Sequence, residues 1–399
     1  MGNASRCGRI LFITHNYPRH GEDFAGRFLA RLAGQLISEG DQVTVLAPHH
    51  PGAALKETVE RVRVVRFRYG PDHRETLAYR GDLGKVSLIG PRGILAHQRF
   101  FSSFRRAALE LVRSDPPDVI HAHWWVPGGW IARGLPFSGR VIVTLHGTDL
   151  RMLQQKSYLR PLAARVFQRA EVVTVVSTWL AETLARLVPS VTGRLHVTPM
   201  PPDDAVFVPS VEPRRDDPVP TVLCVTRFTG QKRNSVLLDA LSLLRQQKIE
   251  FKARFIGDGP LRRDCEERAR SLELTNVVVF DDPRPQSELA EAYRESTVTV
   301  LPAVDEGFGM TLLEAQLCGT AVIGARSGGL TDIIEHEKTG LLAGPDDPQS
   351  LADVLGRVLS DQALRLRLAQ EGQRSARDRF SSRAIVARFR EWYFGSPVG

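Results

Sequence analysis

The sequence predicts an α/β protein made of two doubly wound, Rossmann-like domains in tandem. Short apolar runs alternate with amphipathic helical stretches along the 399 residues. Such alternation is typical of parallel sheets that are covered by helices on both faces. A stretch with seven prolines, 199–220, interrupts the alternation near the middle of the chain. The chain is long enough to form two hydrophobic cores, one on each side of this stretch.

The first half contains strand candidates that are apolar and rich in β-branched residues. Helices are expected between them, for example over 24–39 and 99–113, where apolar residues recur at helical spacing. The predicted strands are 9–14, 42–47, 62–67, 119–122, 140–145, 172–176 and 195–197.

The same alternation restarts after the proline-rich stretch. Strands are predicted at 221–226, 251–256, 277–280, 298–301 and 321–324, followed by a turn-rich stretch to residue 344. Helices are predicted at 235–246, 261–272, 287–295, 310–318, 350–359, 361–380 and 384–394.

These elements predict the following domain organisation. The first domain spans 1–205, a linker spans 206–220, and the second domain spans 221–380. A terminal helix lies within 381–399, and packing back on the first domain is one arrangement open to it.

The amino-acid composition indicates the class of protein to which the chain belongs. The hydrophobic fraction of 42% and charged fraction of 25% are typical of a globular chain. Four scattered cysteines form no CxxC pair, which argues against a zinc site or disulfide framework and is compatible with a reducing cytosol. The opening residues hold only a short apolar run, and no stretch approaches the roughly 18 residues needed to span a bilayer. A cytoplasmic protein is therefore expected.

Charge is unevenly distributed between the two halves. Residues 1–205 hold 27 Lys and Arg against 17 Asp and Glu, whereas the whole chain has a net charge of +8. A basic first domain suggests an anionic partner surface, and ordinary solubilising charge is the alternative. Nucleic acid is not expected as a partner, because no helix-turn-helix, zinc-finger or aromatic RNA-binding pattern is present.

The stretch EGFGMTLLEAQL, which follows a predicted strand, is the strongest candidate for a site. Gly309 precedes a helix, so Glu306 lies in the loop and Glu314 about one turn inside the helix. The free N–H groups at the helix start, around Met310, Thr311 and Leu312, form an anion site. Carboxylates accept paired hydrogen bonds from vicinal hydroxyls. The pattern therefore predicts a ligand that is both polyhydroxylated and anionic, such as a nucleotide sugar; two solvated surface glutamates are the alternative.

Two cations follow the first strand of the second domain, in VTRFTGQK. Arg227 and Lys232 would stabilise the negative charge that a diphosphate leaving group develops. A solvated loop is the alternative for this pair.

Other candidates lie at the ends of further predicted strands. His146, in TLHGTD, is followed by Asp149, which would cap the next helix or orient the histidine. Gly21, between the first strand and first helix, would let backbone amides approach a phosphate or an acceptor. Gly257, in IGDGP, is expected at a turn beside the nucleotide base, and the segment lacks the third glycine of a dinucleotide fingerprint.

The segment HAHWWVPGGW could form a metal site or a sugar-stacking cluster. An H-x-H pair in an extended segment points both rings to one side, but no third ligand is evident, so no metal site is expected. The tryptophans are expected to pack in the core.

The spacing of Glu306 and Glu314 resembles the E-x7-E motif of the family-four retaining glycosyltransferases, which have the GT-B fold. The Arg227 and Lys232 pair is similar to the family's R-x4-K pair, and HGTD to its HG-x-D segment. The resemblance implies two Rossmann-like domains that face an interdomain cleft, with Glu306 and His146 contacting the donor sugar and Glu314 holding the nucleotide ribose. It also implies that backbone near Arg284 contacts the base, although relatives usually have glycine and an apolar residue in this segment. The family's glycine pair is also split here, because Glu22 follows Gly21.

The activity that the resemblance implies is transfer of a hexosyl unit from a nucleotide diphosphate sugar to an acceptor hydroxyl, with retention and without a metal or other cofactor. Synthesis of a glycan, exopolysaccharide or glycolipid is the expected context. A GT-B phosphorylase or epimerase, or a non-catalytic sugar-binding protein, are the alternatives.

The acceptor is the least defined partner. The basic segment 74–113 holds eight Arg and Lys against three Asp and Glu. It favours a glycan or lipid-linked acceptor and peripheral contact with an anionic membrane at its cytoplasmic face; an ordinary loop and helix is the alternative.

Overall fold

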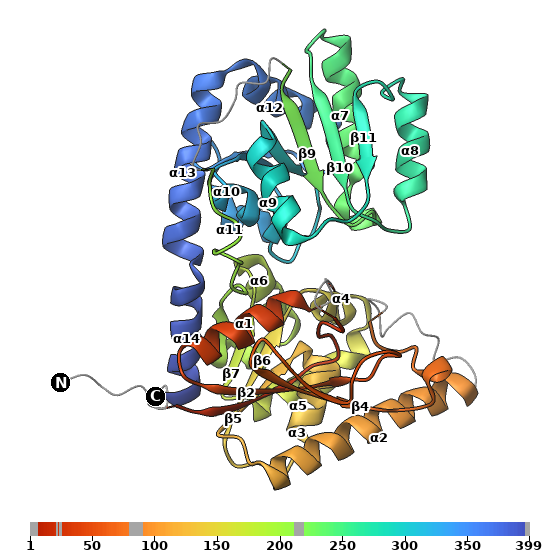
Figure 1. Cartoon of the computed structure of the whole chain (residues 1–399), viewed down its shortest axis with the longest axis vertical. Helices are drawn as coiled ribbons and strands as arrows, with labels where there is room; N and C mark the ends of the chain where they lie inside the picture. Colours follow the sequence, from red (N-terminus) through yellow and green to blue (C-terminus); the bar gives the residue numbers. More distant parts are fainter. Residues whose placement is uncertain (1–6, 21–22, 24–25, 80–90, 211–218, 396–399) are drawn as a thin grey trace, which may run out of the picture. The chain divides into compact units, whose positions relative to one another are not determined.

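In the computed structural model the chain forms two compact units, Met1–Pro201 with Ser382–Gly399, and Pro202–Ser381. The structure describes residues 7–20, 23, 26–79, 91–210 and 219–395 (Figure 1). The first unit ends at Pro201, whereas the sequence prediction places this boundary at residue 205. The segment from Ser382 onward belongs to the first unit.

The first unit is built on an eight-stranded sheet with the order β3-β4-β2-β1-β5-β6-β7-β8. All neighbouring strands run parallel except β3 and β4. Strand β3 was not predicted from the sequence, because its side chains are mostly exposed and show no apolar pattern. The strands are β1 (Arg9–Ile13), β2 (Gln42–Pro48), β3 (Lys56–Val59), β4 (Val62–Phe67), β5 (Val119–His123), β6 (Arg140–Leu145), β7 (Val172–Val175) and β8 (Leu195–Val197).

Helices cover both faces of this sheet, with α1 and α2 on opposite sides (Figure 1). The α-helices are α1 (Arg27–Ser38), α2 (Pro91–Ser114), α3 (Trp130–Arg133), α4 (Thr148–Gln155), α5 (Arg160–Arg169), α6 (Thr178–Leu187) and α14 (Ser382–Phe394). Shorter helical turns are η1 (Asp72–Arg74), η2 (Trp124–Gly129), η3 (Ser157–Leu159) and η4 (Pro189–Arg194). Helix α1 starts three residues later than predicted, at Arg27, because Gly26 has a left-handed conformation with φ 68°. A Cβ atom at Gly26 would lie 2.5 Å from the carbonyl oxygen of Asn16, so only glycine fits there.

The last helix, α14, completes the core of the first unit. Phe389 is fully buried, and the Tyr393 hydroxyl lies 2.6 Å from Nδ1 of His121 on β5. Arg140 donates to the carbonyl oxygen of Trp392, and Arg390 to that of Glu39. The terminal helix is therefore part of the first unit's packing.

The second unit is built on a six-stranded sheet with the order β11-β10-β9-β12-β13-β14, and all its strands run parallel. The last strand lies within the stretch that the sequence analysis treats as turns. It has only three residues, which is too short for a pattern. The strands are β9 (Thr221–Val225), β10 (Lys252–Ile256), β11 (Val278–Asp281), β12 (Val298–Leu301), β13 (Ala321–Ala325) and β14 (Leu341–Ala343).

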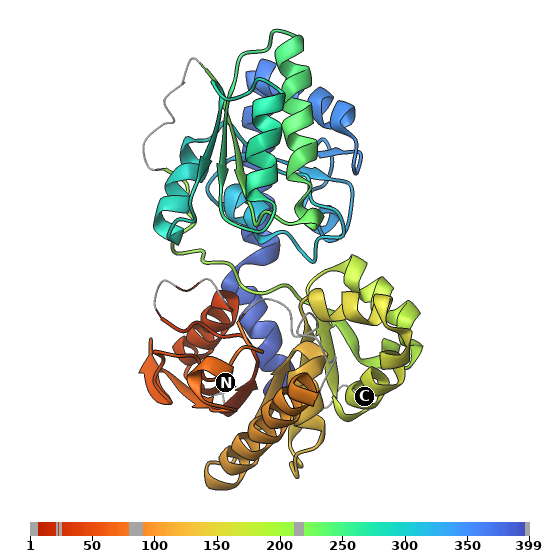
Figure 2. The ribbon, with the colours of Figure 1, turned by 90° about the vertical axis from the view of Figure 1, so that its right-hand side faces the viewer.

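Helix α7 packs on α8 and α12, whereas α10 packs on α9 and α13 (Figure 2). The helical elements of the second unit are η5 (Gly230–Lys232), α7 (Asn234–Gln246), α8 (Arg262–Ser271), α9 (Gln286–Glu295), α10 (Met310–Leu317), α11 (Leu330–Ile333), α12 (Pro348–Ser360) and α13 (Gln362–Phe380). None of the described helices combines the length and apolar character that crossing a membrane requires.

Part of the predicted linker is packed against the second unit. Phe207 is 1% exposed, and its ring centroid lies 5.9 Å from that of Tyr293. The carbonyl oxygen of Val208 accepts a hydrogen bond from Arg294. The packing of Phe207 against Tyr293 therefore holds the start of the proline-rich segment against the second unit.

Candidate active site

The sheet of the second unit reverses its strand order between β9 and β12. Strands β10 and β11 lie on one side of β9, and β13 and β14 lie beyond β12. The loops that follow β9 and β12 therefore leave the same edge of the sheet as neighbours. This topological switch point is where open α/β sheets bind their ligands.

Two predicted site residues meet at this edge. The Lys232 ammonium, in η5 after β9, lies 2.7 Å from Oε2 of Glu306, in the loop after β12. Their side chains are only 19% and 16% exposed, so the pair is largely screened from water. Arg227, directly after β9, is exposed, and its side chain makes no hydrogen bond or ion pair with any described residue. One free and one paired cation thus lie in the same loop.

Backbone contacts fix the loop that carries Glu306. The amide of Gly329 donates to the Glu306 carbonyl oxygen at 2.8 Å, and Ser327 Oγ accepts from the amide of Asp305 at 3.0 Å. Gln231 donates to the carbonyl oxygen of Asp305 at 2.8 Å and so ties this loop to η5. A Cβ atom at Gly328 would lie 2.5 Å from the Glu306 carbonyl oxygen. The position of Glu306 therefore depends on glycine at 328 as well as on Lys232.

Helix α10 begins at Met310, as predicted, and Gly309 before it has φ 102°. No side chain caps the helix, and within the described part of the chain the amides of Met310 and Thr311 make no backbone hydrogen bond. The amide of Leu312 donates to the Gly309 carbonyl oxygen. Two unsatisfied N–H groups at a helix start attract an anion.

Glu314, one turn into α10, has a partner that the sequence analysis missed. The buried Tyr293 hydroxyl, on α9, donates to Oε2 of Glu314 at 3.0 Å. Burial raises the pKa of Glu314 to about 7, and the bond from Tyr293 partly offsets this rise.

Gly257 lets its backbone lie very close to the loop that carries Arg227. It has φ 143°, and a Cβ atom there would lie 1.8 Å from the carbonyl oxygen of Thr226. Beside this contact, the amide of Phe228 donates a hydrogen bond to the carbonyl oxygen of Asp258. This close approach explains the glycine without a ligand, and its predicted place beside a nucleotide base stays a prediction.

Arg284 lies before α9 and pairs with acidic neighbours, Asp281 at 3.9 Å and Glu288 at 3.4 Å. Its Nε atom is buried and has no hydrogen-bond partner in the described residues. The predicted backbone contact to a base stays a prediction at this position too.

In the first unit, His146 follows β6 and His123 ends β5, the neighbouring strand. Nδ1 of His123 lies 3.3 Å from Nε2 of His146, so one ring donates to the other. Nε2 of His123 is buried and has no partner in the described chain. An orphaned acceptor costs less than an orphaned N–H group. We therefore assign the proton to Nδ1 of His123, which leaves His146 protonated on Nδ1 and accepting at Nε2.

Asp149 is buried beside the turn that carries His146, and its predicted role as a substrate-binding residue stays a prediction. It is 2% exposed, and one oxygen accepts from the amides of His146 and Gly147 while the other accepts from the amide of Trp125. Burial raises its pKa to about 6, and these backbone bonds lower it. These hydrogen bonds hold the turn that carries His146, which agrees with the orienting role weighed from the sequence. Gly21 lies outside the described residues.

Three further groups with metal-ligand atoms gather in the first unit, within 4.8 Å of one another: His49, Asp72 and Glu75. Nδ1 of His49 lies 2.5 Å from Glu75, and Arg68 pairs with Asp72 at 2.8 Å. Because each group already has a partner of its own, the cluster needs no ion to satisfy it.

The surroundings of His146 predict that it stays uncharged at ordinary pH. Burial lowers the pKa of His146 to about 3, and His15 adds to this effect. NMR spectra of ring-labelled protein should therefore show no titration of His146 between pH 5 and 8, and should show the Nδ1-protonated form. A midpoint near 6.5, the ordinary value, would contradict this environment.

Comparisons with known proteins agree with this architecture. A family model described as "Glycosyl transferase 4-like domain" matches residues 25–201, and one described as "Glycosyl transferases group 1" matches residues 210–375. The chain is 30% identical to the D-inositol 3-phosphate glycosyltransferase of Corynebacterium urealyticum over 70% of this chain and 72% of the relative. It is 32% identical to that of Streptosporangium roseum over 70% and 69%.

Solved structures show the same fold at lower identity. Sucrose-phosphate synthase of Thermosynechococcus elongatus superimposes with a TM-score of 0.77 at 24% identity, covering 97% of this chain and 98% of that one. HepE of Anabaena, solved with UDP-glucose, gives a TM-score of 0.72 at 18% identity over 96% and 98%. The matching families and relatives show that this chain belongs to the family-four glycosyltransferases and has the GT-B fold.

Proposed function

We propose that this glycosyltransferase moves a hexosyl unit from a nucleotide diphosphate sugar to an acceptor hydroxyl, with retention of anomeric configuration. One observation carries the proposal: the Lys232–Glu306 ion pair lies at the switch point, in the loop that leads to the uncapped start of α10. Amides and a cation suit a diphosphate, whereas carboxylates suit sugar hydroxyls. A nucleotide sugar presents both kinds of group.

The donor is assigned to the second unit as follows. The α10 amides, Lys232 and Arg227 hold the diphosphate, and Glu314 accepts hydrogen bonds from the ribose hydroxyls. The structure of HepE with UDP-glucose supports UDP-glucose as the first donor to test. His146 keeps the sugar-contacting role that the family resemblance implies.

The proposed chemistry needs no nucleophile from the protein. The bond between the anomeric carbon and the diphosphate oxygen breaks, and the acceptor oxygen bonds to the same carbon from the same face. The acceptor proton passes to the departing phosphate oxygen, so atoms and charge balance. Arg227, Lys232 and the α10 amides stabilise the charge that develops on the diphosphate, which is the task that a bound cation performs in other enzymes. Glu306 orients the sugar.

Synthesis of a glycan, exopolysaccharide or glycolipid is the proposed context. The names of the relatives suggest a phosphorylated cyclitol, and D-inositol 3-phosphate is the first acceptor to test. A phosphorylase would instead consume inorganic phosphate, so product formation without added phosphate separates the two activities.

The first prediction concerns Glu306. Glu306→Gln should lower kcat at least about 100-fold, because the variant loses the charge that orients the sugar and leaves Lys232 unpaired. Glu335→Gln is a matched control, since Glu335 also pairs with a lysine, Lys338, but in an exposed position. Steady-state kinetics and thermal melting check both variants. Full activity in a folded Glu306→Gln protein would contradict the proposed role of Glu306 in orienting the sugar.

The pKa of Glu314 predicts a pH-dependent affinity for nucleotide. Ribose hydroxyls donate to a carboxylate, so binding must remove the proton that Glu314 holds below about pH 7. The affinity for UDP should be constant above pH 7 and should fall by up to about tenfold per pH unit below it. Calorimetry from pH 5.5 to 8.5 measures this.

Glu314→Gln provides the control for this experiment, because it keeps the titration of the nucleotide itself. The variant should bind UDP more weakly at pH 8 and lose the additional slope. Identical pH profiles for the two proteins would exclude Glu314 from the ribose site.

Metal independence gives a further prediction. Transfer should continue at an unchanged rate in excess EDTA, because Arg227, Lys232 and the α10 amides supply the positive charge. A rate that disappears with EDTA and returns with manganese would show that these groups do not suffice.

We also propose that the protein is cytoplasmic and contacts an anionic membrane through α2. Ile94 and Leu95 are 48% and 45% exposed near its start, and Arg99, Arg105 and Arg106 are exposed along it. Apolar side chains beside cations suit a lipid surface.

The fraction of protein that sediments with lipid vesicles should increase with their content of anionic lipid. It should decrease in the double variant Ile94→Ser/Leu95→Ser. Equal sedimentation with neutral and anionic vesicles would contradict the proposed membrane contact.

A further inference from the structure

Tyr293, on α9, is held in place by three parts of the second unit. It is fully buried, and its ring packs edge-on against that of Phe207, with the ring centroids 5.9 Å apart. Its carbonyl oxygen accepts a hydrogen bond from the hydroxyl of Thr320, in the loop after α10, at 2.6 Å. The hydroxyl of Ser296, at the end of α9, donates to the same oxygen at 3.0 Å. The tyrosine hydroxyl therefore has a defined place in a close-packed core.

The two oxygens of the Glu314 carboxylate have different surroundings. Oε2 accepts the hydrogen bond from Tyr293 at 3.0 Å. Oε1 makes no hydrogen bond with any residue that the structure describes, and it is not buried. A carboxylate group has a broad range of torsion angles about its last bond, so a partner is needed to fix its orientation. The hydrogen bond from Tyr293 therefore decides which oxygen of Glu314 stays open to a ligand.

The Tyr293 hydroxyl keeps its proton and therefore donates to Glu314 throughout the physiological pH range. Burial and the charge of Glu314 raise the pKa of Tyr293 well above its ordinary value. A hydrogen bond donated to a carboxylate favours the ionised form, so this bond opposes the rise that burial causes in the pKa of Glu314. Cys318, at the end of α10, also faces Glu314. Its thiol is uncharged, because burial raises its pKa to about 12.

We propose that Tyr293 is a positioning residue for nucleotide binding: its hydroxyl holds one oxygen of Glu314 and leaves the other directed to the ribose hydroxyls. This inference rests on the proposed function, because it concerns the carboxylate that is assigned to the ribose. Tyr293 is fully buried, so it acts on the nucleotide through Glu314. It does so in two ways, since the hydrogen bond both orients the carboxylate and favours its ionised form.

The variant Tyr293→Phe tests the effect on Glu314 itself. It keeps the ring that packs against Phe207 and removes only the hydroxyl. Loss of this donor should raise the titration midpoint of Glu314 by about one pH unit. Carbon-13 NMR of glutamate-labelled whole protein, without nucleotide, measures the midpoint in both proteins. An unchanged midpoint would contradict the proposal.

Calorimetry with UDP measures the effect on binding. At pH 7, Tyr293→Phe should bind UDP at least about fivefold more weakly than the original protein, because a smaller share of Glu314 is ionised. At pH 9 the carboxylate is largely ionised in both proteins, and a smaller difference of about threefold should remain from the lost orientation. A general weakening of the fold would lower the affinity by the same factor at both pH values, and that result would overturn the proposal.

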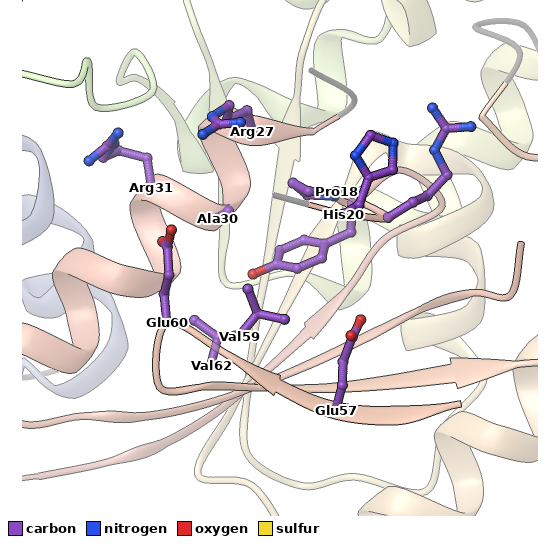
Figure 3. A pocket seen from close by; sticks show the side chains of 11 residues that line it. Pro18, His20, Arg27, Ala30, Arg31, Glu57, Val59, Glu60 and Val62 are labelled. Carbon is purple, nitrogen blue, oxygen red and sulfur yellow. The ribbon is translucent and has the colours of Figure 1, made fainter. Parts of the chain in front are cut away.

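Tyr17→Phe is the matched control, because it removes a buried tyrosine hydroxyl that has no carboxylate partner. Tyr17 is 3% exposed and lines a cavity of about 190 Å³ in the first unit, between α1 and the β3–β4 hairpin (Figure 3). Its hydroxyl makes no hydrogen bond with any of the described residues. The control should leave the Glu314 midpoint and the UDP affinity unchanged. If it shifts the midpoint as Tyr293→Phe does, the shift does not come from the bond to Glu314.

Failure of this proposal can be distinguished from failure of the proposed function. The NMR titration contains no nucleotide, so it tests the bond between Tyr293 and Glu314 whatever Glu314 binds. Glu314→Gln tests the ribose assignment separately. If Glu314→Gln weakens UDP binding and Tyr293→Phe changes neither the midpoint nor the affinity, only the positioning role is wrong. If Glu314→Gln binds UDP like the original protein, the ribose assignment is wrong and the positioning role fails with it.

Discussion

The ion pair between Lys232 and Glu306 is the interaction on which the candidate site depends. It joins the two loops that leave the sheet of the second unit where the strand order reverses. A largely buried pair adds little net stability, because desolvation offsets much of its attraction. Its value here is positional: the charges that would meet a diphosphate and a sugar are fixed against each other before any ligand arrives. Gly328, Gln231 and Tyr293 each support one part of this arrangement.

The strand and helix pattern of the second unit could be predicted closely except for the short β14, because its central strands β9, β12 and β13 are largely buried and read as apolar runs. Glu306 at a strand end and Met310 at a helix start also followed from glycine positions alone. In contrast, β3 is an edge strand with exposed side chains, and its pairing with β4 depends on backbone hydrogen bonds that carry no sequence signal.

The partners of the site residues could not be predicted. Tyr293 lies 21 positions from Glu314 on another helix, and His123 lies 23 positions from His146 on another strand. Such contacts depend on tertiary packing, which spacing along the chain does not encode. Asp149 shows the same limit: its sequence context does not reveal that its oxygens accept hydrogen bonds from four backbone amides.

The path of the chain through the first unit has a consequence for biosynthesis. This unit is discontinuous, since its core includes α14 from the other end of the sequence, with Tyr393 bonded to His121. A ribosome releases the whole of the second unit before it delivers that helix. The second unit can therefore fold during translation. The first unit stays incomplete, with part of its apolar core exposed, until α14 has been synthesised. Loss of the last helix would harm the half of the protein that was made first.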